Sequence, residues 1–547
     1  MIKNPILPGF NPDPCICRKG DDYYLLTSSF EWLPGLPVYH SRDLKHWEII
    51  SHILTDEKAL GLHNLPSAKG VWAPCLTYCE QDDLFYVIYG VMNSMNGGYF
   101  DINNYLITSK SICGSWSEPV YLHSAGFDAS IYHGDDGRKW IVSLEWETRE
   151  NKTKPGEICI AEYLPSEKRI AENPKRIWNG CTKRGSIEAP HIFKHGDYYY
   201  LMCAEGGTGY GHCATCARSK NVCGPYEADP NGYIITSTPG ELNERGNIDH
   251  FKRQHYNKDL TLQKAGHGSY VETQNGEHYL VFHVGRPFVP ELRCTLGRES
   301  CIAKMVWSED GWLRTEDGTG LASEYCNEPM LPEYKSKEIP ERDDFNKDRL
   351  GLEYYSPRLM PQRISSLADR EGYLRIYGNE SLCSLNKVGF VARRLTSVYA
   401  DVTVKLEFEP EVYQHSAGIA VYYDNMDYIY LKKYRSTSMD CAALNVEAME
   451  NGERRIYGRT EIKDGVPVYL RIKMRGRSVR FEFGYDGKDF KDLGVELDLS
   501  KLSDEYCTYG EFTGTSVGMV CIDRLFHRKY ADFDFFEYKA DETKNVE

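Results

Sequence analysis

The feature of this 547-residue chain that most constrains its fold is a short repeated motif. A polar turn that enters an aromatic strand recurs five times, at residues 22–26, 83–87, 136–141, 197–201 and 277–281. Repeats of this length leave room for several strands each, which is typical of the blades of a β-propeller. Five copies therefore predict a propeller of five blades.

The rest of the chain also has the pattern of an all-β protein. Short runs rich in Tyr, Val, Ile and Phe are bounded by Gly, Asp, Asn and Pro, and sustained helical periodicity is scarce. A charged, Pro-bearing segment between Tyr334 and Arg342 is typical of a linker. Beyond it, Val402, Val404 and Leu406 alternate with polar residues. We therefore predict a five-bladed β-propeller over residues 1–335 and a jelly-roll-like β-sandwich over residues 336–547.

A second regularity precedes each repeated turn by eight to eleven residues. A polar or aromatic residue stands there at the start of the strand that leads into the turn: Asp13, Trp72, Asp128, Glu188 and His267. In a propeller, these strands line the central channel, so equivalent positions converge at one mouth. The alternative, in which these are ordinary turn residues, explains a single Asp well but three carboxylates in register poorly. We expect the five side chains to face one another around the channel.

Three carboxylates on one pocket wall suit the hydrolysis of a glycosidic bond. One carboxylic acid protonates the leaving oxygen, and a carboxylate on the other face activates water. A third carboxylate can raise the pKa of the acid by like-charge repulsion. Phe30, Trp72 and Trp146 offer flat faces on which a sugar ring can stack.

Charge narrows the class of partner. The chain has 65 Lys and Arg against 80 Asp and Glu, a net charge of −15. This balance disfavours nucleic acid and anionic membranes, which need clustered positive charge, and it favours a small neutral ligand. The nearest glycine-rich loop, at residues 206–209, has no Lys to meet a phosphate, so a nucleotide enzyme is disfavoured.

The compartment is predicted from the cysteines and the hydropathy. We find no apolar run of membrane-spanning length and no signal-peptide pattern at the N-terminus. The 18 cysteines are then expected to be reduced thiols in the cytoplasm. Cys213 and Cys216 form a Cys-x-x-Cys pair, but the segment has the pattern of a strand, so their side chains point to opposite faces and a metal or redox role is not expected.

An ordered set of motifs gives the chain a close resemblance to a known family. The segments are NPILPGFNPDP, DDYYLLTSSFEWLPG, GVWAP, GFDASIYHGDDGRKW, EAPHIFKHGDYYYLMCAEGGTGYGH, AGHGSYVET and LGRES, followed by ARRL, KLEFEPE, AGIAVYYDN, EFTG and ADFDFFEY. In this order they resemble glycoside hydrolase family 43, and within it the two-domain β-xylosidases. The resemblance covers nearly the whole chain and implies an inverting hydrolase with a propeller catalytic domain.

The resemblance also implies roles for individual residues. Asp13 matches the general base, Glu188 the general acid, and Asp128 the residue that tunes and orients the acid. Arg298 matches an arginine that binds sugar hydroxyls. His267 matches a histidine beneath the sugar, near which some members hold a divalent cation. No cofactor is implied as required, and Ca²⁺ or Mg²⁺ at the propeller axis is the possible addition.

The pocket walls follow from the same resemblance. Phe30, Trp72, Trp146 and Thr208 match pocket-lining positions that contact substrate. The sandwich domain resembles a lid whose Phe-Thr-Gly loop closes the pocket so that only chain ends enter. Here Ser516 stands where relatives commonly have an aromatic residue, which predicts a wider or more polar pocket edge.

The function that the resemblance implies is an exo-acting β-1,4-xylosidase that releases xylose from the non-reducing end of xylooligosaccharides with inversion. The alternative is an α-L-arabinofuranosidase, as the sole or a second activity, because the two sugars can present similar hydroxyl geometry. A more remote alternative is a non-catalytic sugar-binding propeller. Relatives often form dimers or tetramers, so a homo-oligomer is expected.

Overall fold

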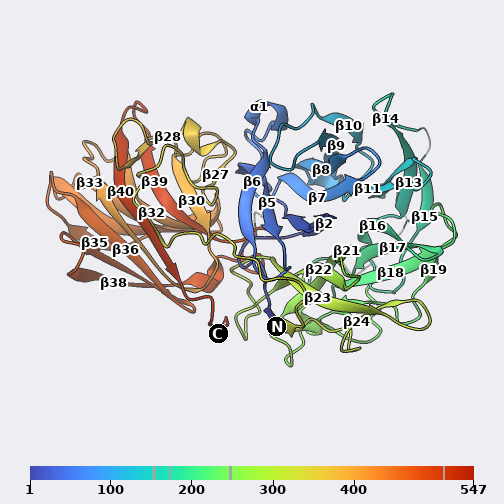
Figure 1. The fold of residues 1–547 in the computed structure, drawn as a ribbon. Helices are drawn as coiled ribbons and strands as arrows, with labels where there is room; N and C mark the ends of the chain where they lie inside the picture. Colours follow the sequence, from blue (N-terminus) through green and yellow to red (C-terminus); the bar gives the residue numbers. More distant parts are fainter. Residues whose placement is uncertain (151, 153–154, 172–173, 246–248, 509–511, 547) are drawn as a thin grey trace.

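The computed structural model consists of two all-β units that lie side by side (Figure 1). It describes residues 1–547 except 151, 153–154, 172–173, 246–248, 509–511 and 547. The predicted architecture, a five-bladed propeller followed by a β-sandwich, is confirmed. Helix is restricted in the described residues to α1 (Glu57–Leu60) and the short 3₁₀ segments η1 (Asn96–Gly98), η2 (Arg253–His255), η3 (Pro361–Arg363) and η4 (Leu499–Lys501). None of these helices is long and apolar enough to cross a membrane.

Five antiparallel sheets make the blades of the propeller, and each sheet follows the chain from its inner to its outer strand. The first two blades are β2 (Cys15–Lys19), β3 (Asp22–Leu26), β5 (Gly35–Ser41) and β6 (Glu48–Leu54), then β7 (Gly70–Cys79), β8 (Leu84–Ser94), β9 (Asp101–Ser109) and β10 (Val120–His123). The third is β11 (Ser130–His133), β12 (Lys139–Leu144), β13 (Ile158–Leu164), β14 (Arg169–Ile170) and β15 (Lys175–Trp178).

The fourth blade is β16 (Glu188–His195), β17 (Tyr198–Glu205), β18 (Cys213–Ser219), β19 (Glu227–Ala228) and β20 (Ile235–Thr236). The fifth is β21 (Gln263–Glu272), β22 (His278–Gly285), β23 (Glu299–Trp307) and β24 (Leu313–Thr315). The repeated turn of the sequence is the hairpin that joins the first and second strands of each blade.

The innermost strands close into a ring. β2 contacts β7, β7 contacts β11, β11 contacts β16, β16 contacts β21, and β21 returns to β2. At the N-terminus, β1 (Ile2–Lys3) pairs with β25 (Tyr325–Cys326), which follows the fifth blade. The start of the chain is thereby tied to the end of the propeller, and the five innermost strands hold fixed positions around one axis.

In or just before each innermost strand, a residue near the channel mouth has the left-handed backbone conformation. The φ angles are 55° at Asp13, 36° at Ala73, 55° at Asp128, 50° at Ala189 and 51° at His267. Residues held there cost free energy, of order 1–3 kcal/mol each, and such strain concentrates at functional sites. In β7, β16 and β21 the pairing register also shifts at this point. A kink therefore re-aims the side chains at the mouth of the channel.

The sandwich packs two sheets around its own apolar core. One sheet contains β28 (Ser365–Ser366), β29 (Leu374–Tyr377), β40 (Tyr530–Ala540), β31 (Tyr399–Glu407), β36 (Val468–Arg475), β37 (Ser478–Gly484) and β38 (Phe490–Asp498), with β26 (Arg342–Asp343) beside β40. The other contains β30 (Phe390–Arg394), β39 (Ser516–Asp523), β32 (His415–Asp424), β33 (Asp427–Ser436), β34 (Cys441–Glu450) and β35 (Glu453–Glu461). The predicted boundary near residue 335 falls between β25 and β26.

The two units share an apolar interface. β4 (Trp32–Leu33), from the first blade, pairs with β27 (Ser356–Pro357). The Trp32 ring meets Phe390 at 6.0 Å and Tyr422 at 5.8 Å, both edge to face, and these residues belong to one buried cluster. Because aromatic burial of this kind dominates interface energetics, the sandwich is fixed against the propeller. This placement brings a loop of the sandwich to the channel mouth.

Candidate active site

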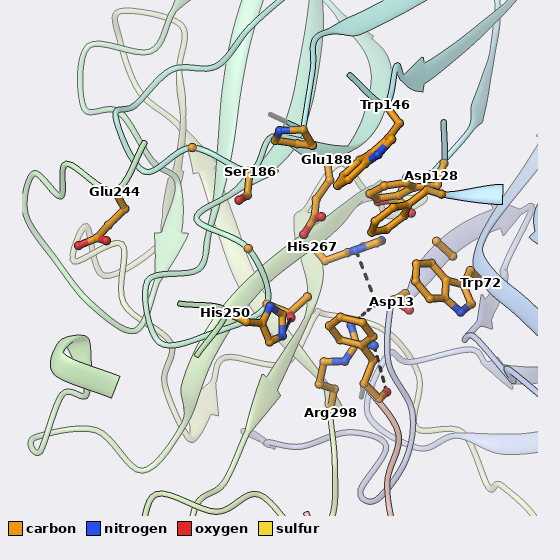
Figure 2. A pocket seen from close by; sticks show the side chains of 18 of the residues that line it. Asp13, Trp72, Asp128, Trp146, Ser186, Glu188, Glu244, His250, His267 and Arg298 are labelled. Atoms are coloured by element: carbon orange, nitrogen blue, oxygen red, sulfur yellow. Dashed lines mark hydrogen bonds and ion pairs between the residues drawn. The ribbon is translucent and has the colours of Figure 1, made fainter. Parts of the chain in front are cut away.

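The ring positions converge on a single cavity of about 670 Å³ (Figure 2). Asp13, Trp72, Asp128, Glu188 and His267 all line it, one from each blade. Their similar offsets from the repeated turn predicted that these residues lie together, and in the structure they line the same cavity. The kinks described above explain why residues at or before the strand ends point inward rather than along the sheet.

Asp13 is held as a carboxylate by cationic and hydrogen-bonding neighbours. Arg298 Nη1 lies 2.7 Å from Oδ1, and the Ser28 hydroxyl donates to Oδ2 over 2.6 Å. The Nδ1 atoms of His283 and His267 lie 3.3 and 3.6 Å from Oδ1. Burial by itself would raise the pKa of Asp13, but the charge of Arg298 and the hydrogen bond with His283 outweigh it and bring this pKa well below the usual range.

Glu188 has the opposite environment. Burial, reinforced by the negative charge of Asp13, raises the pKa of Glu188 to about 7, although the charges of Arg298 and Lys252 oppose the rise. Its Oε1 is buried with no hydrogen-bond partner among the described residues. The nearest imidazole nitrogen, Nε2 of His212, is 4.0 Å away. Glu188 can therefore hold a proton near neutral pH and present it to a ligand.

Asp128 is tied to the backbone beside Glu188. Its Oδ2 accepts a hydrogen bond from the N–H of Ala189 over 3.0 Å. Burial and then the charges of Glu188 and Asp13 raise the pKa of Asp128 well above its usual value. The hydrogen bond spans the third and fourth blades, so Asp128 helps to fix the kink that aims Glu188 into the cavity.

Aromatic rings wall the cavity. Of the predicted stacking residues, Phe30 and Trp72 meet edge to face at 6.0 Å, and Trp146 stacks on Phe100 at 3.7 Å. The indole N–H of Trp146 donates to the Gly98 carbonyl over 2.9 Å, which fixes the ring. All three predicted residues line the cavity. The flat apolar faces suit the C–H surfaces of a sugar ring.

Arg298 and Thr208 connect the carboxylates to the rim. Besides its contact with Asp13, Arg298 donates from Nη2 to the Phe512 carbonyl over 3.1 Å, and its Nε is buried without a partner among the described residues. The Thr208 hydroxyl and His250 Nε2 are 3.0 Å apart, and the His250 ring meets Phe512 edge to face at 5.0 Å. Both predicted residues therefore contact the loop that covers the cavity, directly or through His250.

Sequence reasoning missed several residues of the wall. Phe100, Phe127 and His250 line the cavity, and His283 lies behind Asp13. Phe127 directly precedes Asp128, so the repeat could have signalled it. The others lie on a loop or on a second strand, where the offset from the repeated turn carries no information. Phe512, of the Phe-Thr-Gly loop predicted to close the pocket, also lines the cavity.

The expectation that Ser516 forms the pocket edge is wrong. Ser516 is the first residue of β39, where it is buried and pairs with Arg394 and Tyr422. One residue earlier, the Thr515 N–H donates a hydrogen bond to the Thr295 carbonyl of the propeller. The chain is therefore held in the domain interface before Ser516 is reached. Within the described part of this loop, Phe512 is the residue that reaches the cavity.

Two glycines allow the Arg298 and Phe512 loops to meet. A Cβ on Gly297, whose φ is 76°, would lie 2.5 Å from the Thr513 carbonyl oxygen. A Cβ on Gly514 would lie 2.7 Å from the Leu296 carbonyl oxygen. Contacts this short are not tolerated by real side chains, so glycine is required where the two backbones approach.

The groups around Asp13 were also tested against a divalent cation. Asp13, His267 and His283 place one ligand atom each within 4.8 Å of one another. Ca²⁺ and Mg²⁺ take mainly oxygen ligands, whereas this set offers one carboxylate, already paired with Arg298, and two imidazoles. The residues fit a hard cation poorly. The Ca²⁺ or Mg²⁺ expected near His267 stays a prediction.

Together, the fold and the site define a β-propeller hydrolase with an ionised carboxylate and a carboxyl group of raised pKa in one aromatic pocket. Comparison with known proteins agrees with this class. The family model "Glycosyl hydrolases family 43" matches residues 2–313, and "Beta xylosidase C-terminal Concanavalin A-like domain" matches residues 342–539. The chain therefore belongs to glycosyl hydrolases family 43, as the motifs predicted.

Individual relatives cover the whole architecture. The "Beta-xylosidase" of Bacillus subtilis is 37% identical, with 98% of this chain and 99% of the relative covered. The "Xylosidase/arabinosidase 43B" of Humicola insolens is 35% identical, with 98% of each covered. A crystal structure of "xylan beta-1,4-xylosidase from Bacillus Halodurans C-125" superposes with a TM-score of 0.91 at 41% identity, covering 98% of this chain and 100% of that one.

Proposed function

We propose that this chain is an inverting β-xylosidase that releases xylose from the non-reducing end of β-1,4-xylooligosaccharides. The observation that carries the proposal is that Asp13, paired with Arg298, and Glu188, whose buried Oε1 has no partner among the described residues, line one cavity. These surroundings move the pKa of Asp13 well below its usual range and raise that of Glu188 to about 7. The β-xylosidases of Bacillus subtilis and Bacillus halodurans, which match over their full lengths, support the choice of sugar.

In the proposed reaction, both carboxyl groups act in one displacement. Glu188 gives its proton to the glycosidic oxygen as the bond to the anomeric carbon breaks, and the shortened sugar leaves as an alcohol. Asp13 accepts a proton from a water molecule, whose oxygen bonds to the anomeric carbon on the opposite face. The products are xylose of inverted configuration and the shortened chain. Solvent then returns a proton to Glu188 and removes one from Asp13.

The neighbours assist these two steps. Arg298 keeps Asp13 ionised, and its buried Nε and remaining N–H groups are available to sugar hydroxyls. Asp128 fixes the backbone next to Glu188 through the Ala189 N–H. We assign Asp128 the role of a positioning residue that holds the acid at the leaving oxygen.

The covering loop supports an exo mode of action. Phe512 of the sandwich packs edge to face on Trp72 at 5.8 Å and lies beside Arg298 and His250. A pocket walled by both domains accepts the end of a chain better than its middle. The sandwich then serves the reaction by shaping the pocket rather than by binding sugar independently.

A second activity on α-L-arabinofuranosides is favoured by one observation. The relative from Humicola insolens carries both activities in its name, and it matches this chain over 98% of each length. The test is to compare kcat/KM for the nitrophenyl β-D-xyloside and α-L-arabinofuranoside. A ratio that strongly favours the arabinoside would overturn the choice of xylose, whereas unchanged turnover in Asp13→Asn or Glu188→Gln would overturn the mechanism and leave a sugar-binding propeller.

We also propose that hydrolysis needs no cofactor, that the chain forms a dimer or tetramer, and that it acts in the cytoplasm. The 18 cysteines are all free, which supports a reducing compartment. Loss of activity after exhaustive chelation would overturn the proposal that no cofactor is needed. A monomer in light scattering would overturn the proposed oligomer, and recovery of the enzyme outside the cells in a fractionation would overturn the proposed compartment.

A further inference from the structure

A second ring of side chains lies deeper in the propeller channel than the carboxylates. The inner strands of the first, second and fourth blades contribute Cys15, Cys75 and His191. Each of these residues lies two positions after one of the left-handed residues near the channel mouth. Their ligand atoms converge from three blades, so all three side chains project toward the axis.

These side chains have the composition and spacing of a metal site. The two sulfur atoms and one imidazole nitrogen all lie within 4.8 Å of one another. Bonds of about 2.3 Å to sulfur and about 2.0 Å to nitrogen would place tetrahedral ligands roughly 3.5–3.8 Å apart. Side-chain rotations that shift the ligand atoms by about 1 Å bring the set to that geometry.

Two hydrogen-bond donors lie beside the Cys15 sulfur, whose own S–H donates to the Leu76 carbonyl over 3.6 Å. The backbone N–H of Leu76 lies 3.2 Å from its sulfur, and the Ser269 hydroxyl donates to it over 3.7 Å. Groups that donate to a ligating sulfur orient it and stabilise its charge. Cys15 and Cys75 are buried, whereas His191 is partly exposed, which leaves the ring accessible to an ion.

We propose that Cys15, Cys75 and His191 bind one Zn²⁺ ion on the propeller axis. Binding replaces two S–H bonds by two Zn–S bonds, releases both protons to solvent, and uses the lone pair of the neutral imidazole. The cluster carries no net charge, as suits a buried position. Solvent completes the fourth position. The ion links three blades across the channel, and the proposal does not depend on the reaction assigned to the pocket.

The ring differs chemically from the group around Asp13 above it. Thiolate and imidazole ligands both suit Zn²⁺, for which Co²⁺ is a coloured substitute, whereas carboxylate and imidazole alone give no metal–sulfur bond. Cobalt reports the difference, because only thiolate ligation produces an intense sulfur-to-cobalt charge-transfer band. The spectrum thus tells a metal in the second ring from a metal bound by Asp13 and His267.

The experiment uses the full chain, produced with Zn²⁺ or Co²⁺ in the growth medium and dialysed against a chelator. We expect about one equivalent of metal per chain and, for cobalt, the thiolate band with tetrahedral d–d absorption. Cys75→Ala should abolish the band and lose at least 90% of the metal. The matched variant Cys301→Ala, which removes another fully buried thiol, should keep both.

His191→Gln provides a second test that preserves both thiols and should also lose the metal. Circular dichroism establishes that each variant is folded. Should Cys75→Ala fail to fold, the absorption spectrum of the unmodified chain decides alone. Metal-free protein, bound cobalt without the thiolate band, or a band that survives Cys75→Ala or His191→Gln would each overturn the proposal.

Discussion

The assignment of Glu188 as general acid makes a quantitative prediction about pH. Burial and the charge of Asp13 raise its pKa to about 7, and only the protonated form can serve the leaving group. A group with this pKa is about nine-tenths protonated at pH 6 and about one-tenth protonated at pH 8. We therefore expect kcat/KM on xylobiose to fall about tenfold between pH 6 and pH 8.

Glu188→Gln removes the ionisation with little change of shape. We expect kcat on xylobiose to fall about 10²–10⁴-fold, and the residual activity to lose its decline above pH 6. A nitrophenyl xyloside should suffer a much smaller loss, because its leaving group is far more acidic than a sugar hydroxyl and needs little protonation. The assay is a pH profile of kcat/KM on both substrates.

Glu272→Gln serves as the matched control, since Glu272 is an exposed glutamate of β21. Its profile should overlay that of the unmodified chain. If Glu188→Gln keeps a decline in kcat/KM with the same midpoint near pH 7, another group is the acid, and the reasoning from the pKa of Glu188 is refuted.

Three further predictions concern other parts of the structure. Asp13→Asn should lower kcat about 10²–10⁴-fold in a chain that circular dichroism shows to be folded, and a loss under tenfold would contradict its role as base. Phe512→Ala should raise KM about tenfold, because Phe512 lines the cavity. Phe526→Ala, which removes a 65% exposed phenylalanine of the same domain, should leave KM unchanged. Equal effects of the two variants on KM would contradict the role of Phe512 in covering the pocket. Glu505→Gln should lower the free energy of unfolding by about 3–5 kcal/mol in urea titrations, because it leaves the buried Lys264 ammonium without its carboxylate. A change under about 1 kcal/mol would contradict a stabilising role for this buried ion pair.

The repeat explains why so much of the site could be predicted from sequence. Asp13, Asp128 and Glu188 lie eight or nine residues before a turn that recurs in every blade, and a propeller converts that near-constant offset into a shared position around its axis. Symmetry therefore supplied the long-range contacts that a single sequence does not normally reveal. The kinks that aim the side chains inward were not predictable, since Ala73 and Ala189 carry no signal for a left-handed conformation.

Residues outside the repeat were predicted less well. His283 is on a second strand, and His250 lies on an irregular segment between blades. Phe512 reaches the cavity only because the domain interface around Trp32 places its loop there. The error at Ser516 has the same origin, because the point at which a loop becomes a strand depends on contacts such as that of Thr515 with Thr295.

In the proposed mechanism, Asp13 and Glu188 act in one displacement at the anomeric carbon. Proton NMR of xylobiose hydrolysis, recorded in the first minutes before mutarotation, distinguishes this displacement from a two-step route. Xylose released from the non-reducing end should appear first as the α-anomer. Initial release of β-xylose would mean retention through a covalent intermediate and would contradict the assignment of Asp13 as a general base.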